Sequence, residues 1–461
     1  MSKKLTTNEL QKILLETRNG VVELLKTVTH SKRMQVLVLL LNKPKKFSML
    51  RNETKLSKTA LANHLTQLLE KGLIEKIERG NYRITRDGEE LLEAAANVYI
   101  ESSAKKARQR AQLRERYSQG YKAVDELKLN EKIVSNQPEY QHCWVSYLGA
   151  VSGVLKSLGN DYDITDVGGY SGYSFFVNVA KGTTCPSGPT AHQNWKEIIK
   201  GTENLGWKLH SFDDNKSFPN SDGLLTEEDQ KRASNLFNKI KAEIDKNDRP
   251  VVLWGVPVPE YGIVKGYQGD SYVVSTFRSA IGQPDLPIKY DSLQAPGCLH
   301  AIFFTGKTSE ISEQNDKYAL KQAIKMAEGT TGVREGYIAG PAAYDEWATV
   351  LEKASAEDVP YHGNSYVGAC TCETKELEAT FLERLATKYS DQPQATSLSL
   401  AAQEYRKAEA LMKQFVELFP FAMTGELSGE KRKKGAELLR KVKPLELSAL
   451  SHLKTAYEQW S

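Results

Sequence analysis

The sequence predicts a multidomain chain: a small basic α+β region, then a larger α+β region, then an all-α region. The 461 residues suffice for two or three domains. Residues 1–120 hold 24 Lys+Arg and 13 Asp+Glu, a charge of +11, so a total of +4 leaves −7 for the rest. This asymmetry favours a nucleic-acid-binding head on a body with another role. The alternative that charge leaves open is a solvated basic surface.

The first region is predicted to contain four helices and a hairpin. Apolar residues at helical spacing indicate a helix over 8–28, and a second helix runs from Ser31 toward Pro44. A short third helix over 48–55 precedes a fourth, which Ser57 caps and Gly72 stops.

A Gly80-Asn81 pair between two apolar stretches is then typical of a tight hairpin. A long, highly charged helix follows from about Glu89 to Tyr117.

This order of elements, over about residues 30–90, resembles the winged helix-turn-helix of the ArsR and MarR regulator families. The resemblance implies a DNA-binding domain over 1–88 that meets double-stranded DNA, with the fourth helix in the major groove and the hairpin over the phosphates or the minor groove. Two alternatives stay open: individual residues can be merely solvated, and winged helices also bind proteins. The predicted DNA-binding residues are Ser57, Lys58, Thr59, Asn63 and Gln67 on the helix and Lys76, Arg79, Asn81 and Arg83 on the hairpin.

The charged segment over 89–125 is expected to be a linker or dimerisation helix. In regulators of this kind such a helix pairs with its twin, so the resemblance implies a homodimer with two recognition helices about one DNA turn apart. The alternative is a rigid linker.

The second region, 130–308, alternates strand-like and helical patterns. Strands are expected over 173–180, 250–256, 261–267, 271–277 and 299–306, and helices over about 142–158 and 226–247. The third region, 310–461, reads as helical, with segments near 313–328, 340–354, 374–389, 396–418 and 428–460.

Cys143 is the most suggestive residue for chemistry, because it is predicted to start a helix whose first-turn amides would favour a thiolate. Four pieces of the sequence together resemble the N-terminal domain of the butirosin biosynthesis protein H family. They are the segment around His142-Cys143, the stretch DVGGYSGYSFFV, an LWG strand and GIVKGYQGDSYVV. That resemblance implies a papain-like fold, and the namesake of the family is an acyltransferase that works from an acyl-carrier protein.

The sequence departs from the papain-like pattern where the catalytic histidine is expected. Position 260, six residues before Gly266-Tyr267, is Glu260, and a thiol needs a base or cation partner. His300 is a possible substitute. We therefore expect a catalytically silent domain that keeps a ligand pocket, in which a Glu beside aromatic rings could receive a cationic or hydroxylated effector. The predicted pocket residues are Cys143, Trp144, Tyr147, Tyr170, Tyr173, Phe175, Trp254, Glu260 and Tyr261, although these aromatic residues could equally be core.

Three functions compete at this point. The first is a transcription regulator that responds to a small-molecule effector. The second is an acyltransferase or amidohydrolase that uses Cys143 and His300, and the third is a chromatin-type DNA-binding protein without a ligand. We expect no cofactor, no metal and no membrane span, since nucleotide-binding and zinc motifs and long apolar runs are missing. Five sparse cysteines and no secretory signal favour a cytoplasmic setting.

Overall fold

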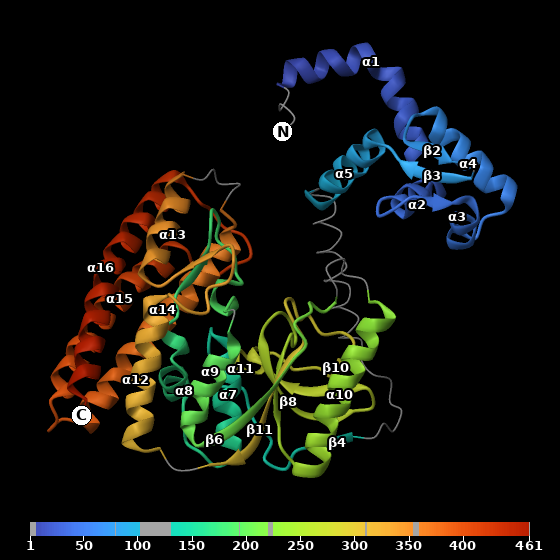
Figure 1. The fold of residues 1–461 in the computed structure, drawn as a ribbon. Coiled ribbons are helices and arrows are strands. Elements are labelled where there is room, and N and C mark those ends of the chain that lie inside the picture. The colour runs from blue at the N-terminus through green and yellow to red at the C-terminus, as the bar shows by residue number, and fades with distance from the viewer. Residues whose placement is uncertain are drawn as a thin grey trace. The chain divides into compact units, whose positions relative to one another are not determined.

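The computed structural model describes residues 6–78, 80–101, 131–192, 194–219, 225–308, 311–353 and 359–460. The chain divides into two compact units, residues 1–111 and residues 112–461, which we call the head and the body (Figure 1). Each is described by itself.

The head is built from helices around a small antiparallel sheet of order β1-β3-β2. Its apolar faces close on one core that includes Leu37, Leu61, Leu65 and Leu68. Its elements are α1 (Thr7–Val28), α2 (Ser31–Leu40), β1 (Lys45–Lys46), α3 (Phe47–Thr54), α4 (Lys58–Glu70), β2 (Ile74–Glu78), β3 (Asn81–Ile84) and α5 (Arg86–Glu101).

Local signals set the boundaries of these elements. The Ser57 hydroxyl accepts a hydrogen bond from the amide of Ala60 at 3.2 Å, so the predicted cap of the fourth helix is confirmed. Gly80 has a φ of +77° at the hairpin turn, where a Cβ would be strained. Helix α5 starts at Arg86, ahead of the expected Glu89, and residues 102–117 of the expected long helix lie outside the described residues.

The body contains a seven-stranded antiparallel sheet of order β10-β9-β8-β7-β11-β6, with β4 paired to β8. Helices α7 and α10 both pack on β8, which is buried along nearly its whole length. The strands are β4 (Glu131–Ile133), β6 (Trp207–Asp213), β7 (Val251–Trp254), β8 (Tyr261–Gln268), β9 (Ser271–Ser275), β10 (Ile288–Lys289) and β11 (His300–Lys307). The helices of this part are α7 (Ser146–Ser157), α8 (Ile164–Ser171), α9 (Trp195–Thr202), α10 (Glu227–Asn247) and α11 (Phe277–Ala280), and β5 (Asn178–Ala180) pairs with β12 (Tyr337–Ala339).

Long helices complete the body and lie side by side in Figure 1. They are α12 (Glu313–Glu328), α13 (Pro341–Lys353), α14 (Tyr361–Lys388), α15 (Gln394–Leu418) and α16 (Gly429–Gln459). The main hydrophobic core contains residues from Val134 through Trp460. Helices α12 and α14 contribute to it by packing on α8. The regions 130–308 and 310–461 thus share a core.

Two expectations about elements of the body are corrected. The strand expected over 173–180 begins as a 3-10 turn (Tyr173–Phe175), and only β5 is extended. The glycine-rich stretch before it forms helix α8, whose Gly169 faces Phe381 so closely that a Cβ would lie 2.1 Å from the ring. Helix α14 starts at Tyr361 rather than near residue 374, so Cys370 lies inside a helix.

Candidate functional site

Cys143 lies in front of helix α7 and not in its first turn, which corrects the sequence prediction. The helix begins at Ser146, and its N-cap is Val145. The amides of Trp144 and Val145 both donate to Glu373 Oε2, at 2.8 and 3.2 Å. A carboxylate from α14 therefore takes the amides that were expected to stabilise a thiolate.

The thiol itself is held in its neutral form. Cys143 Sγ donates to Glu373 Oε2 at 3.0 Å. Burial, reinforced by the negative charge of Glu373, raises the pKa of Cys143 well above its usual value. Sequence reasoning missed Glu373, because 230 residues separate it from Cys143 and only the packing of α14 brings the two together.

Glu260 lies beside this site, at the turn before β8. Its carboxylate accepts hydrogen bonds from the hydroxyls of Ser146 and Tyr366. The Ser146 hydroxyl also accepts from the amide of Tyr261 at 3.0 Å. Burial raises the pKa of Glu260 to about 7, and burial also raises that of Glu373.

The other predicted pocket residues fall into separate places. Tyr147, Tyr173, Trp254 and Tyr261 form an aromatic cluster with Trp195, with ring centroids 4.9–5.6 Å apart. Tyr170 instead donates to Asp316, at 2.5 Å, and Phe175 packs on Tyr405. Only Cys143, Trp144 and Glu260 of the predicted set meet at Glu373 and Tyr366.

His300, the possible substitute base, is engaged elsewhere. Its Nδ1 pairs with the Tyr261 hydroxyl at 2.8 Å, and its ring centroid lies 5.8 Å from that of Trp195. Burial lowers the pKa of His300 to about 4. The hydrogen-bond partner of Cys143 is thus a carboxylate and that of His300 a phenol.

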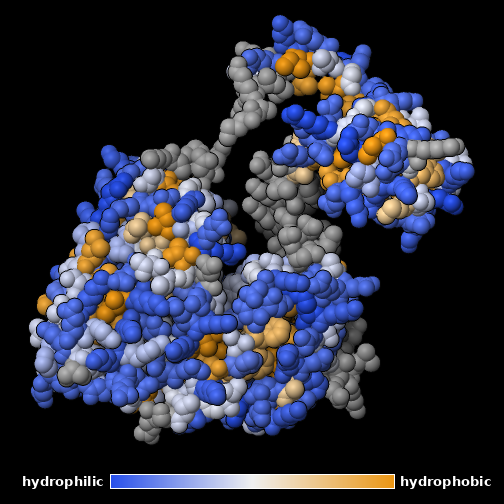
Figure 2. All heavy atoms as spheres, in the orientation of Figure 1, coloured by the Kyte–Doolittle hydropathy of each residue, from blue (hydrophilic) through white to orange (hydrophobic). Residues whose placement is uncertain are grey.

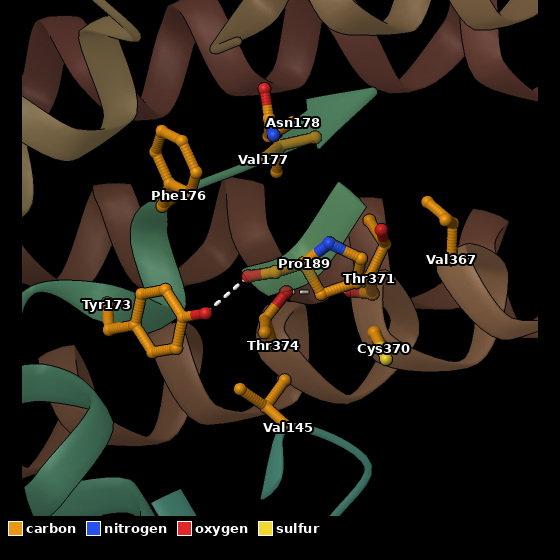
Figure 3. A pocket seen from close by; sticks show the side chains of 10 residues that line it. All are labelled: Val145, Tyr173, Phe176, Val177, Asn178, Pro189, Val367, Cys370, Thr371 and Thr374. Atoms are coloured by element: carbon orange, nitrogen blue, oxygen red, sulfur yellow. Dashed lines mark hydrogen bonds between the residues drawn. The ribbon is translucent and has the colours of Figure 1, made fainter. Parts of the chain in front are cut away.

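A small cavity lies next to Cys370 of α14 and encloses about 20 Å³ (Figure 3). Of the predicted pocket residues, only Tyr173 lines it, and its hydroxyl donates to the Pro189 carbonyl. That volume holds about one water molecule, which is too little for an organic effector. Its lining residues are Val145, Tyr173, Phe176, Val177, Asn178, Pro189, Val367, Cys370, Thr371 and Thr374.

Among the described residues, no three His, Cys, Asp or Glu side chains are placed to share a metal ion.

The exposed face of α4 carries the head's predicted DNA contacts. Lys58, Thr59 and Asn63 are exposed, as is the capping Ser57. Thr66, which the sequence reading omitted, is exposed on the same helix. Leu61, Leu65 and Leu68 hold the other side of α4 in the core.

Gln67 has a partner inside the head. Its side-chain oxygen accepts from the guanidinium of Arg33, which also donates to the Lys26 carbonyl at 2.9 Å. Gln67 is therefore tied to α2.

The hairpin presents Lys76 and Arg83 to solvent, and Asn81 is half-buried. Arg83 Nε donates to Glu75 Oε1 at 2.8 Å across the two strands, so part of its charge is balanced. Arg79 lies outside the described residues.

Residues 30–76 match the family model described as "Bacterial regulatory protein, arsR family". The matched segment runs from the start of α2 into β2 and so contains the whole of α4. The match supports the ArsR part of the resemblance and indicates a DNA-binding transcription regulator. No curated protein matches the chain.

Helix α1 precedes this arsR-type helix-turn-helix and shows apolar side chains to solvent (Figure 2). Ile13, Leu14, Val22 and Leu25 are each 41–48% exposed, and Leu15 is 70% exposed. The described helices of the chain include none that is long and apolar enough to cross a membrane.

Proposed function

We propose that the chain is a cytoplasmic transcription regulator that binds double-stranded DNA as a homodimer and responds to a small-molecule effector held by a catalytically silent body. The observation that carries the proposal is the exposed face of α4 inside the matched segment. Ser57, Lys58, Thr59 and Asn63 suit base edges and phosphates in the major groove.

The apolar face of α1 supports a dimer. This 22-residue helix has five large apolar side chains that are each at least 41% exposed. Leaving so much apolar surface in water is unfavourable. Leu14 and Leu25 are eleven residues apart, about three helical turns, so they lie on one side of the helix. A second copy of the chain would bury this face and bring two recognition helices together.

The cluster of Glu260, Glu373 and Trp144 is the effector site we favour. All three residues are half-buried. An effector bound there regulates DNA affinity only if it binds one of two conformations better than the other.

The proposal includes a papain-like fold for the body, without catalytic activity. The acyltransferase alternative is disfavoured, because Cys143 donates to a carboxylate and the pKa of its thiol is raised.

Selection of binding sites from a random double-stranded DNA library by the full chain tests the proposal. We expect an enriched inverted repeat whose half-site centres are about 10–11 base pairs apart. Tight binding without enrichment, with a steep salt dependence, would instead support the chromatin-type alternative. No DNA binding at all would overturn the proposed function.

A further inference from the structure

The first half of helix α16 concentrates positive charge on a body that is negative as a whole. Residues 429–443 hold seven Lys or Arg and two Glu, a charge of +5, whereas residues 121–461 together carry −7. The run Lys431–Lys434 is the only place in the chain where three or more Lys or Arg follow one another. This segment therefore has a local charge opposite to that of the body around it.

The other long helices of the body do not share this excess. Helices α10, α12 and α15 hold equal numbers of cationic and anionic side chains, and α13 and α14 are negative. Helix α10 begins with Glu227, Glu228 and Asp229, as the positive end of the helix dipole favours. In α16 only Glu430 follows that preference before the cationic run starts. The run therefore does not serve the stability of its own helix.

Part of the positive charge of α16 is used inside the body. Arg440 pairs with Glu352 at 2.6 Å, and Lys443 pairs with Asp345. Arg432 donates to a carbonyl of α13 at 3.3 Å. These contacts hold α16 against α13, so their cations have a structural role.

Lys433, Lys434 and Lys441 are left on the outer side of α16. All three are exposed, and within the part of the chain that the structure describes their side chains form no ion pair or hydrogen bond. The helix itself lies at the outer edge of the body, packed on α13 and α15 (Figure 1). Lys434 and Lys441 are two turns apart and so lie on one side of the helix, separated by about 10 Å along its axis. A DNA strand presents a phosphate about every 3.4 Å along the duplex, so this spacing spans about three phosphates.

We propose that the first half of α16 binds the phosphates of the DNA that flanks the site read by the head, through Lys433, Lys434 and Lys441. This inference rests on the proposed function, since it adds a second contact to the same duplex. Charge complementarity selects the occupant, because DNA is the polyanion that the head brings to the chain. Contacts to phosphates carry no sequence information, so the body adds affinity and salt dependence rather than base preference.

Two duplexes separate the contact made by the body from that made by the head. One ends at the selected half-sites, and the other extends them on each side by about 30 base pairs, or three helical turns, of arbitrary sequence. The full chain is titrated with each by fluorescence anisotropy over a series of salt concentrations. On the long duplex we expect the slope of log affinity against log salt to be steeper by at least about 2, because each phosphate contact adds about 0.9. Equal slopes would overturn this inference and leave the regulator proposal standing, whereas no binding to either duplex would overturn the proposed function.

A triple variant assigns the added slope to α16. Lys433→Gln with Lys434→Gln and Lys441→Gln should lower the slope on the long duplex to that on the short one and leave binding to the short duplex unchanged. The three side chains are exposed, so the variant should fold, which urea unfolding checks. Arginine at the same three positions should keep the wild-type slope, because the charge is retained. A glutamine variant with the wild-type slope on the long duplex would refute the assignment.

Helix α10 offers a matched control for the loss of three charges. Its Lys231, Lys239 and Lys246 are exposed as well, but acids of the same helix balance them. Lys231→Gln with Lys239→Gln and Lys246→Gln should therefore leave the difference between the two duplexes intact. If this variant lowers the slope as much as the α16 variant does, the effect comes from net charge, and the proposed contact is wrong.

Anionic vesicles test the other kind of surface that a basic helix can meet. Phe421 and Met423, which are 43% and 67% exposed, precede α16, and basic segments beside exposed apolar side chains also bind bilayers. The full chain and the α16 triple variant are sedimented with phosphatidylglycerol vesicles. We expect no cosedimentation that depends on the three lysines. Vesicle binding that requires these lysines, together with unchanged slopes on DNA, would replace DNA by a membrane as the partner.

Discussion

The Cys143 thiol donates its hydrogen to Glu373 Oε2 at 3.0 Å, and the same oxygen accepts the amides of Trp144 and Val145. The carboxylate thus holds the chain just before α7 and opposes loss of the proton from the thiol. The arrangement is the reverse of an activated nucleophile, in which a base or cation would face the sulfur.

We therefore expect Cys143 to be unreactive. At pH 7 it should alkylate with iodoacetamide at least about ten times more slowly than glutathione, because its thiolate fraction is small. Mass spectrometry of the labelled peptides resolves Cys143 from the other four cysteines. Glu373→Gln should speed its labelling, and wild-type labelling faster than glutathione would restore the acyltransferase alternative.

The exposed face of α4 allows two kinds of DNA contact to be separated. Lys58→Ala should weaken binding to all sequences and lower the slope of log affinity against log salt by about 0.9, as loss of one phosphate contact does. Asn63→Ala should cost about 1–3 kcal/mol at one base pair and relax its preference. Fluorescence anisotropy on the selected site measures both, with Lys71→Ala at the other end of α4 as the control.

The apolar face of α1 predicts the oligomeric state. Leu14→Asp with Leu25→Asp should convert a dimer into a 51.6-kDa monomer, because charges cannot be buried in that face. Light scattering after size exclusion gives the mass directly. Asn19→Asp adds a charge away from Leu14 and Leu25 on the same exposed helix and should leave the dimer intact. A monomeric wild type, or a dimeric double variant, would exclude this face.

We expect substitution of the buried Lys375 to lower the stability of the body strongly. It is fully buried between Glu378 and Glu446, and the Tyr344 hydroxyl donates to Glu446 at 2.9 Å. Lys375→Met leaves two buried carboxylates without a cation and should cost about 3–5 kcal/mol in free energy of unfolding. Lys407→Met, which removes a more exposed partner of Glu404, should cost less than about 1 kcal/mol. Urea unfolding followed by tryptophan fluorescence compares the two, and equal losses would contradict the prediction.

The lowered pKa of His64 predicts how the stability of the head depends on pH. Burial, with the nearby His30 and Arg33, lowers the pKa of His64 below 6.5, so the folded head binds fewer protons than the unfolded chain. The head should therefore lose stability as pH falls through about 6.5, the unfolded value. The protection factors of the Leu65 and Leu68 amides against hydrogen exchange, which correct for the intrinsic pH dependence of exchange, should fall between pH 7.5 and 5.5. His64→Phe should remove part of this dependence and keep the ring contact with His30, which spans 4.6 Å.

Several features followed from the sequence because they are local. Each of them depends on residues only a few positions apart in the chain. They are the Ser57 cap, the Gly80 turn, the leucine face of α4 and the boundaries of α10 and α12. The charge division in the first 120 residues needed no structure either. These signals were enough to expect a DNA-binding head, and the family match covers the same segment.

The tertiary structure decided the chemistry of the body, because that depends on pairs far apart in the chain. Glu373 meets Cys143 across 230 residues, and Tyr366 meets Glu260 across 106. The periodicity of the sequence cannot predict these contacts, since they arise where side chains of α14 reach the segments that precede α7 and β8. The sequence alone showed Cys143, and it showed Glu260 at the position where a papain-like enzyme has its catalytic histidine. Packing determined that the thiol faces a carboxylate and that the hydroxyls of Ser146 and Tyr366 donate to Glu260.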